Sequence, residues 1–204
     1  CALPIFQMKS GRLVVPIWLA FGAEGAHGPS AAGTIFSDDH GATWKAGDIA
    51  FPNAGEFKSP NETMLAPLSD GRVMLVARSS SKMNRKLVSV SADGATGWSE
   101  PKFHDQLWEP ICMASIMAHP SGVLLFSNPH TLPQKPGGGG ARKNLSIKLS
   151  RDDGKTWPVN KTLEAGRSAY SDLSVLPDGT VLCLYERGNS IACARFNLQW
   201  INQP

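Results

Sequence analysis

Apolar and polar positions follow a unit that recurs along the chain. In four segments a polar turn containing glycine is followed directly by an apolar run: 9–18, 68–78, 119–129 and 176–187. The turn glycines, which are 60, 51 and 57 residues apart, are Gly11, Gly71, Gly122 and Gly179. Each segment therefore predicts a hairpin turn that leads into a buried strand.

A second motif falls between these segments and keeps the same period. Its copies are SDDHGATW (37–44), SADGATGW (91–98) and SRDDGKTW (150–157). Serine and aspartate side chains bond the amides of such a turn, glycine allows a positive φ, and tryptophan packs against the turn. The motif predicts self-bracing hairpins, in which Asp39 and Asp152 hold the backbone and do not act as acids.

The recurring unit also predicts the fold class. Roughly one four-stranded unit every 50 to 60 residues, without an amphipathic helix, is typical of an all-β β-propeller, and a stacked sandwich is the alternative. The run PQKPGGGGAR (133–142) has no strand pattern and predicts a flexible loop between strands. The length of 204 residues and the 42% hydrophobic content are those of one globular domain.

Charge and cysteine content exclude several classes of function. The net charge of +3 comes from 20 basic and 17 acidic residues without basic runs, which argues against nucleic acid as a partner. No apolar stretch reaches the ~18 residues of a membrane span. The four cysteines form no close metal-ligand pairs. Cys183 and Cys193 flank a turn, so a disulfide between them is conceivable.

The tryptophan-containing boxes resemble those of the sialidases, enzymes that release terminal sialic acid. A more specific resemblance lies in six further stretches, in the order and spacing of that family: 59–81, 107–116, 124–129, 141–157, 169–188 and 191–201. The resemblance implies a β-propeller of sialidase type, six-bladed when complete, of which about the last four blades are present. Residues 1–204 would then be the C-terminal portion of one catalytic domain.

The same resemblance implies roles for five residues. Tyr170 matches the catalytic tyrosine, and Glu62 matches the glutamate paired with it. Arg78 and Arg142 match two members of the arginine triad that binds the substrate carboxylate, and Glu186 matches the acid that orients a triad arginine. The implied activity is that of a retaining exo-α-sialidase acting on sialylated glycans without a metal or organic cofactor. The resemblance favours a secreted, periplasmic or cell-surface location, which the sequence itself leaves unknown.

Chemistry supports a tyrosine at this position independently of the family. Sialic acid carries a carboxylate on its anomeric carbon, and guanidinium groups bind carboxylates through paired, charge-assisted hydrogen bonds. A carboxylate nucleophile would be repelled by that anion, whereas a neutral phenol is not. The phenol, with a reference pKa of ~10, needs a base at neutral pH, and Glu62 could serve if it lies within hydrogen-bond reach of Tyr170.

Two parts of the family pattern have no match in this chain. The first triad arginine and the aspartate that acts as general acid/base cannot be placed. We therefore expect an N-terminal segment or a second chain to supply the first blades and to be needed for full activity. A sugar-binding, lectin-like propeller without turnover and a purely structural propeller are the alternatives. Only the enzyme requires Tyr170 and Glu62 in contact, with both arginines directed at one pocket.

Overall fold

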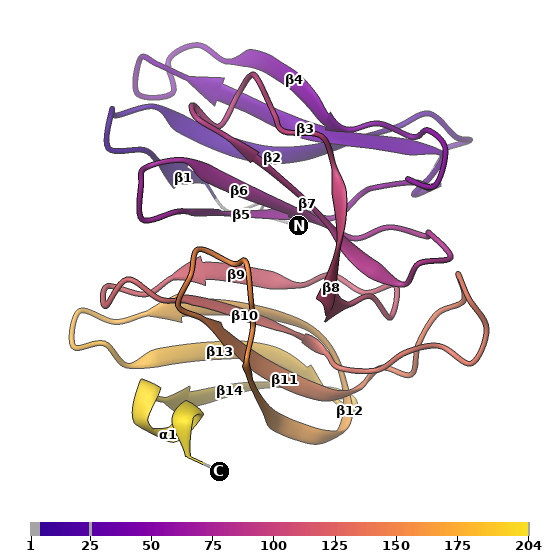
Figure 1. Ribbon diagram of the computed structural model, residues 1–204, viewed down its shortest axis with the longest axis vertical. Helices are drawn as coiled ribbons and strands as arrows, with labels where there is room; N and C mark the ends of the chain where they lie inside the picture. Colours follow the sequence, from indigo (N-terminus) through magenta and orange to yellow (C-terminus); the bar gives the residue numbers. More distant parts are fainter. Residues whose placement is uncertain (1–4, 25, 204) are drawn as a thin grey trace.

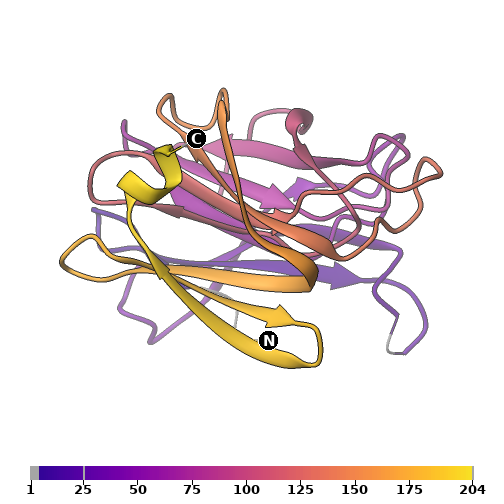
Figure 2. The ribbon, with the colours of Figure 1, turned by 90° about the horizontal axis from the view of Figure 1, so that it is seen from below.

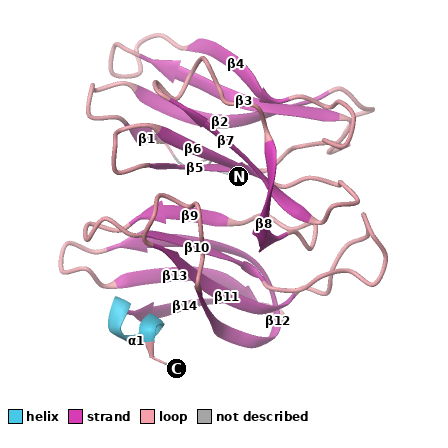
Figure 3. Cartoon of the chain, in the orientation of Figure 1, coloured by secondary structure: helices cyan, strands magenta, loops and turns pink. Residues whose placement is uncertain are grey.

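The computed structural model describes residues 5–24 and 26–203, and these form strands, loops and one short helix, α1 (Leu198–Asn202). Figure 3 shows the strands running across the view in stacked layers, with most of the connecting loops at the left and right sides. In Figure 1 the layers follow one another in chain order down the long axis, from β1–β4 at one end to β13, β14 and α1 at the other. The predicted all-β class is confirmed.

Two of the sheets are four-stranded antiparallel meanders. The first contains β1 (Phe6–Gln7), β2 (Leu13–Ala20), β3 (Ser30–Ser37) and β4 (Lys45–Phe51). The second contains β5 (Thr63–Pro67), β6 (Val73–Ala77), β7 (Arg85–Ser91) and β8 (Lys102–Trp108). In both sheets the strand order in space is the order along the chain, as in a propeller blade.

The remaining strands form a six-stranded sheet that is divided by its longest strand. Its members are β9 (Ser115–Ala118), β10 (Leu124–Pro129), β11 (Lys143–Ser150), β12 (Val159–Val175), β13 (Val181–Arg187) and β14 (Ser190–Phe196). The first half of β12 pairs with β11, and the second half, from Ser168 onward, pairs with β13. Strand β12 thus ends a third blade and begins a fourth.

Tight turns join the first and second strands of each blade, as the glycine spacing predicts. The amide of Gly71 donates to the carbonyl of Leu68, and the amide of Leu68 donates to the carbonyl of Arg72. The same pair of hydrogen bonds closes the turns at the other three glycines. All four turn glycines have φ between 82° and 93°, a backbone conformation that glycine adopts at no steric cost.

The serine and aspartate motifs brace their turns, as predicted. The Oδ1 atom of Asp39 accepts the amide of Thr43 at 2.8 Å, and its Oδ2 accepts the Thr43 hydroxyl at 2.6 Å. Asp152 makes the same two contacts with Thr156 at 2.9 and 2.7 Å. These hydrogen bonds lower the pKa of both aspartates to about 2, which suits a turn brace and not a proton donor at neutral pH.

The hydrophobic core lies between successive blades. One cluster joins the first two blades through residues such as Phe51 and Leu75, and a second joins the middle blades through Val76 and Phe126. A third cluster lies between the third and fourth blades, and its buried members in β11 and β13 are Leu145, Ile147, Leu149, Val181, Cys183 and Tyr185. Sheets packed in such a series form a propeller arc, which excludes the two-layer sandwich. Figure 2 shows the same layers from below.

The two outer blades each leave one sheet face uncovered, and this face carries exposed apolar side chains. In the first blade Ile49 lies in register with Gly33 and Ile17, and it is 46% exposed. In the fourth blade Leu184 and Ile191 lie on the face opposite the core and are 53% and 66% exposed. Strands β2 and β13 are therefore only half-buried, whereas β6 and β10 are buried throughout as predicted.

The disulfide considered between Cys183 and Cys193 is not formed. Both thiols are free, because the β13–β14 register pairs Cys193 with Leu184 and not with Cys183. Adjacent positions on paired strands point to opposite faces, so Cys183 is buried in the core while Cys193 is exposed. In the described part of the chain, no helix is long and apolar enough to cross a membrane.

Candidate active site

Tyr170 lies where β12 changes partners. The pairing of β12 with β13 is regular from Ser171 onward but is shifted between Ser168 and Ser171. Such an irregularity redirects a side chain out of the regular alternation, and it is common beside active sites. The small polar residues around Tyr170 occupy this irregular segment, which accounts for an aromatic residue in a stretch without apolar periodicity.

Glu62 and Arg78 are held at one end of the second blade. Glu62 directly precedes β5, and Arg78 directly follows β6. The amide of Arg78 donates to the carbonyl of Glu62 at 3.0 Å, so the β5–β6 pairing continues to these two residues. Their side chains are fixed by strand ends and not by a mobile turn.

The side chains of these three residues form a closed hydrogen-bonded group. The Tyr170 hydroxyl donates to Oε1 of Glu62 at 2.6 Å, and Nη1 of Arg78 donates to Oε2 of Glu62 at 2.6 Å. Nη1 of Arg78 also donates to the Tyr170 hydroxyl oxygen at 3.2 Å. The side chains of Arg78 and Glu62 are only 13% and 9% exposed, so water screens this group weakly.

This environment keeps the phenol protonated. Burial raises the pKa of Tyr170, and the hydrogen bond and negative charge of Glu62 raise it further, while Arg78 partly opposes them. For Arg78, burial lowers the pKa, but the hydrogen bond and charge of Glu62 outweigh burial and leave the pKa raised. The resting group is thus a neutral phenol beside an arginine–glutamate pair, in which the carboxylate can accept the phenolic proton.

Arg142 and Glu186 reach Tyr170 from the other side. The guanidinium carbon of Arg142, an exposed residue directly before β11, lies 5.3 Å from the centre of the Tyr170 ring. Oε2 of Glu186 accepts the backbone amide of Tyr170 at 3.2 Å. Within the described residues Glu186 forms no ion pair with Arg78 or Arg142. The structure therefore brings the other four predicted residues into contact with Tyr170.

A buried ion pair beneath this group was not predicted. Nζ of Lys86 lies 2.7 Å from Oε2 of Glu109, and the two side chains are 1% and 0% exposed. Glu109 also accepts the amides of Ser79 and Cys112 at 3.3 and 2.9 Å. The available signal was a lysine inside an apolar strand, since lysine is almost never fully buried without a partner.

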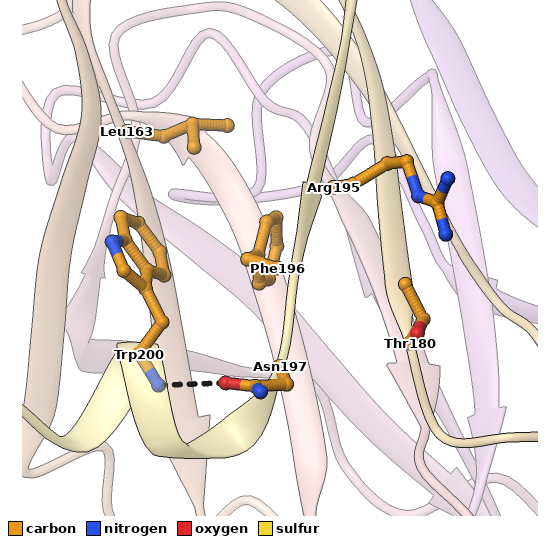
Figure 4. A pocket seen from close by; sticks show the side chains of 6 residues that line it. All are labelled: Leu163, Thr180, Arg195, Phe196, Asn197 and Trp200. Carbon is orange, nitrogen blue, oxygen red and sulfur yellow. Dashed lines mark hydrogen bonds between the residues drawn. The ribbon is translucent and has the colours of Figure 1, made fainter.

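A hollow of about 530 Å³ lies elsewhere, at the opposite end of the fourth blade. Figure 4 shows its lining, in which Asn197 caps α1 by accepting the amide of Trp200 at 2.9 Å. Thr180 and Phe196 flank the ends of β13 and β14 that are remote from Glu186. The residues that line the hollow include no carboxylate, and the hollow is separate from the group around Tyr170. The described residues contain no cluster suited to a metal ion.

Comparison with known proteins connects this geometry to a family. The model of the BNR repeat-like domain matches residues 3–183. The chain belongs to the BNR repeat-like family. A sialidase of Micromonospora viridifaciens is 39% identical over 185 residues, which cover 86% of this chain and 27% of that protein. A sialidase of Bacteroides fragilis is 30% identical over 190 residues, 88% of this chain and 32% of that protein.

Solved structures agree with the propeller fold. The Hadza microbial sialidase Hz136 superposes with a TM-score of 0.74 at 31% identity, over 96% of this chain and 37% of that chain. The intramolecular trans-sialidase of Ruminococcus gnavus superposes with a TM-score of 0.71 at 22% identity, over 98% of this chain and 44% of that chain. The family and the sialidase-type propeller predicted from the sequence are thus confirmed. The chain spans about a third or less of the two curated relatives described above.

Proposed function

We propose that this chain carries the tyrosine side of the active site of an exo-α-sialidase, which hydrolyses terminal sialic acids from glycoconjugates with retention of configuration. The observation that carries the proposal is the 2.6 Å hydrogen bond from Tyr170 to Glu62, shared with Arg78. A structural propeller has no need of a hydrogen-bonded tyrosine–glutamate–arginine group. The proposed activity needs no metal or organic cofactor.

In the first step Tyr170 acts as the nucleophile. Its hydroxyl oxygen forms a bond to the anomeric carbon while the bond to the leaving sugar oxygen breaks, and the phenolic proton passes to Glu62. Arg78 and Arg142 bind the sialic acid carboxylate, and their positive charges stabilise the phenolate as it forms. The leaving oxygen takes a proton from an acid outside the residues assigned here.

In the second step water replaces the tyrosine. The oxygen of water bonds to the anomeric carbon, the bond to Tyr170 breaks, and the phenolate recovers its proton from Glu62. Two displacements at one carbon retain its configuration. The proton that water loses goes to the group that acted as acid in the first step.

An N-terminal segment or chain would complete the site. The uncovered faces of the first and fourth blades carry the exposed apolar side chains of Ile49, Leu184 and Ile191, which support such a partner. Glu186 lies in register with Ile191 on the uncovered face of the fourth blade. An arginine from the added segment could therefore reach Glu186, which we propose as the acid that orients a triad arginine.

Hydrolysis of a fluorogenic sialoside tests this function. We would compare this chain with a version extended upstream, each with and without Tyr170→Phe. We expect turnover in the extended protein and a loss on the order of 10³-fold or more in its Tyr170→Phe variant, because the substitution removes the nucleophile. Saturable binding of sialic acid without turnover in either version would overturn the proposal in favour of a lectin-like propeller.

A further inference from the structure

Arg142 follows a glycine-rich loop, which by composition should leave its side chain mobile. The loop between β10 and β11 contains no strand, as predicted, but it is tied to the protein at several points. The amide of Gly140 donates to the carbonyl of Pro110 at 2.9 Å. Nη2 of Arg142 donates to the carbonyl of Ile111 at 3.4 Å. Both acceptors belong to one short turn, residues 109–112, which lies in another part of the chain.

Close packing also joins the loop to this turn. A Cβ atom at Gly140 would lie 2.7 Å from the Cβ of Pro110, a distance that real side chains do not tolerate. A Cβ atom at the neighbouring Gly139 would meet nothing nearer than the Pro110 carbonyl oxygen at 4.0 Å. The loop therefore approaches the turn through one glycine in particular, while the adjacent glycine has free space.

The turn is fixed from below by the buried ion pair. Lys86 donates to the carbonyl of Cys112 at 2.6 Å, and Glu109 accepts the amide of Cys112 at 2.9 Å. Glu109 also accepts the amide of Ser79, the residue after Arg78. Since a buried ion pair is stable only with both partners and their hydrogen bonds in place, it admits one arrangement of the turn.

Asn84 links the same turn to the start of the loop's glycines. Its Nδ2 donates to the carbonyl of Glu109 at 3.1 Å, and its Oδ1 accepts the amide of Gly137 at 2.8 Å. Asn84 is 5% exposed and has a φ of 48°, a conformation that asparagine tolerates better than most residues. The glycine run 137–140 is thus held at both of its ends, by Asn84, which is bonded to Glu109, and by Pro110, the residue after Glu109.

We propose that Lys86 and Glu109 are positioning residues, which hold the 109–112 turn as a seat for the glycine-rich loop and so place the Arg142 guanidinium over the Tyr170 ring. Neither residue contacts the tyrosine. They act through the turn on Arg142 and through Ser79 on the segment that carries Arg78. The expected effect on substrate binding rests on the proposed function, whereas the expected effect on the order of the loop does not.

Amide exchange and tyrosine NMR test the placement in this chain without any substrate. Gly140→Ala should raise exchange in residues 137–142 about fivefold or more, because it breaks the bond to Pro110. It should also shift the ring resonances of Tyr170, one of only two tyrosines, toward those of Arg142→Ala. Gly139→Ala is the matched control and should leave both readings at the wild-type values.

The ion pair is tested by the paired substitution Lys86→Met with Glu109→Gln, which removes both charges and leaves no unpaired one. We expect faster exchange in residues 137–142 and the same Tyr170 shift. Lys148→Met is the control, because Lys148 is a buried lysine bonded to the carbonyl of Gln106 and not to the turn. If the paired variant does not fold, Glu109→Asp withdraws the carboxylate while keeping the charge.

Amide exchange at the wild-type rate and an unmoved Tyr170 resonance in a folded paired variant would overturn the proposal. If the paired variant does not fold, the same two results in Glu109→Asp would overturn it. In the upstream-extended protein, the paired substitution should raise KM by a larger factor than it lowers kcat. Adding Arg142→Ala to the paired substitution should cause no further loss of kcat/KM. An extended protein without sialidase activity would contradict the proposed function alone, since the exchange and resonance measurements would still decide the role of the ion pair.

Discussion

The two sides of Tyr170 are built differently. On one side Glu62 is buried and Arg78 is largely shielded from water, and the two extend a strand pair and bond each other and the tyrosine at 2.6 to 3.2 Å. On the other side Arg142 is exposed and Glu186 is half-buried, and the two contact Tyr170 through its ring and its backbone. In the proposed function the first side transfers the phenolic proton, whereas the second side receives a ligand or a further segment.

This difference suggests that one side carries the proton transfer and the other side binds the ligand. A base must lie within hydrogen-bond reach of the proton that it removes, and only the buried side meets this condition. An exposed guanidinium group gains little from a surface ion pair, and it binds a ligand well when a carboxylate displaces its water. We therefore expect substitutions on the buried side to affect rate and stability, and substitutions on the exposed side to affect affinity.

The largest effect should come from Glu62→Gln in the upstream-extended protein. The amide cannot accept the phenolic proton, so kcat should fall about 10²- to 10⁴-fold. Steady-state kinetics on a sialoside measure this loss. Glu164→Gln is the control, because Glu164 pairs with Arg187 on the surface and lies outside the group around Tyr170. Equal activity in the wild type and Glu62→Gln would exclude Glu62 as the base.

The next largest effect should be a difference in unfolding free energy between the Arg78→Ala and Arg142→Ala variants. Arg78→Ala leaves Glu62 buried without its ion-pair partner and should cost about 3 kcal/mol of unfolding free energy. Arg142→Ala removes an exposed side chain and should change that free energy by no more than about 0.5 kcal/mol. Urea denaturation of this chain gives both values. Similar losses in the two variants would contradict the contrast between a buried and an exposed side.

Glu186→Gln should have a smaller effect on stability. The amide oxygen of glutamine can still accept the backbone amide of Tyr170, so we expect a loss below about 1 kcal/mol in this chain. In the extended protein the same substitution should raise KM, because it removes the charge proposed to orient a triad arginine. A loss of several kcal/mol in this chain would show that Glu186 is a structural residue on the second side.

The smallest effect concerns the titration of Tyr170. Since Glu62 raises the pKa of the phenol, Glu62→Gln should lower it, which ultraviolet titration in a Tyr185→Phe background would detect. A raised folded-state pKa gives stability that is present below the unfolded value of ~10 and is lost as pH rises through the folded value. Tyr170→Phe should therefore weaken the alkaline loss of stability. An unchanged phenol pKa in Glu62→Gln would contradict the 2.6 Å contact.

Local signals in the sequence predicted the fold well. The glycine turns and the serine–aspartate boxes form hydrogen bonds within a few residues, so their structure depends little on the rest of the chain. The same pattern overstated the burial of β2 and β13, because it contains no information on which sheet face lacks a neighbour. The disulfide considered at Cys183 and Cys193 depended on a strand register that differs from the expected one by a residue.

The site was predicted only in part. Its five residues were found through resemblance to a family, and the spacing of Glu62 and Tyr170 along the chain gives no indication that they touch. The pair Lys86 and Glu109 was missed because a lysine inside an apolar strand indicates burial but does not show which residue pairs with it. The glycine-rich loop was predicted as flexible, since composition does not reveal the hydrogen bonds that Asn84 and Pro110 make with it.

The most direct test of the central claim is mass spectrometry of the upstream-extended protein after reaction with a sialosyl fluoride that carries a second fluorine beside the anomeric carbon. Fluoride leaves without help from an acid, while the second fluorine slows the oxocarbenium-like step that releases the sugar. We predict a sugar bonded to the Tyr170 oxygen, with fluoride released and the phenolic proton on Glu62. An adduct on Glu62, or turnover without any adduct on Tyr170, would contradict the account.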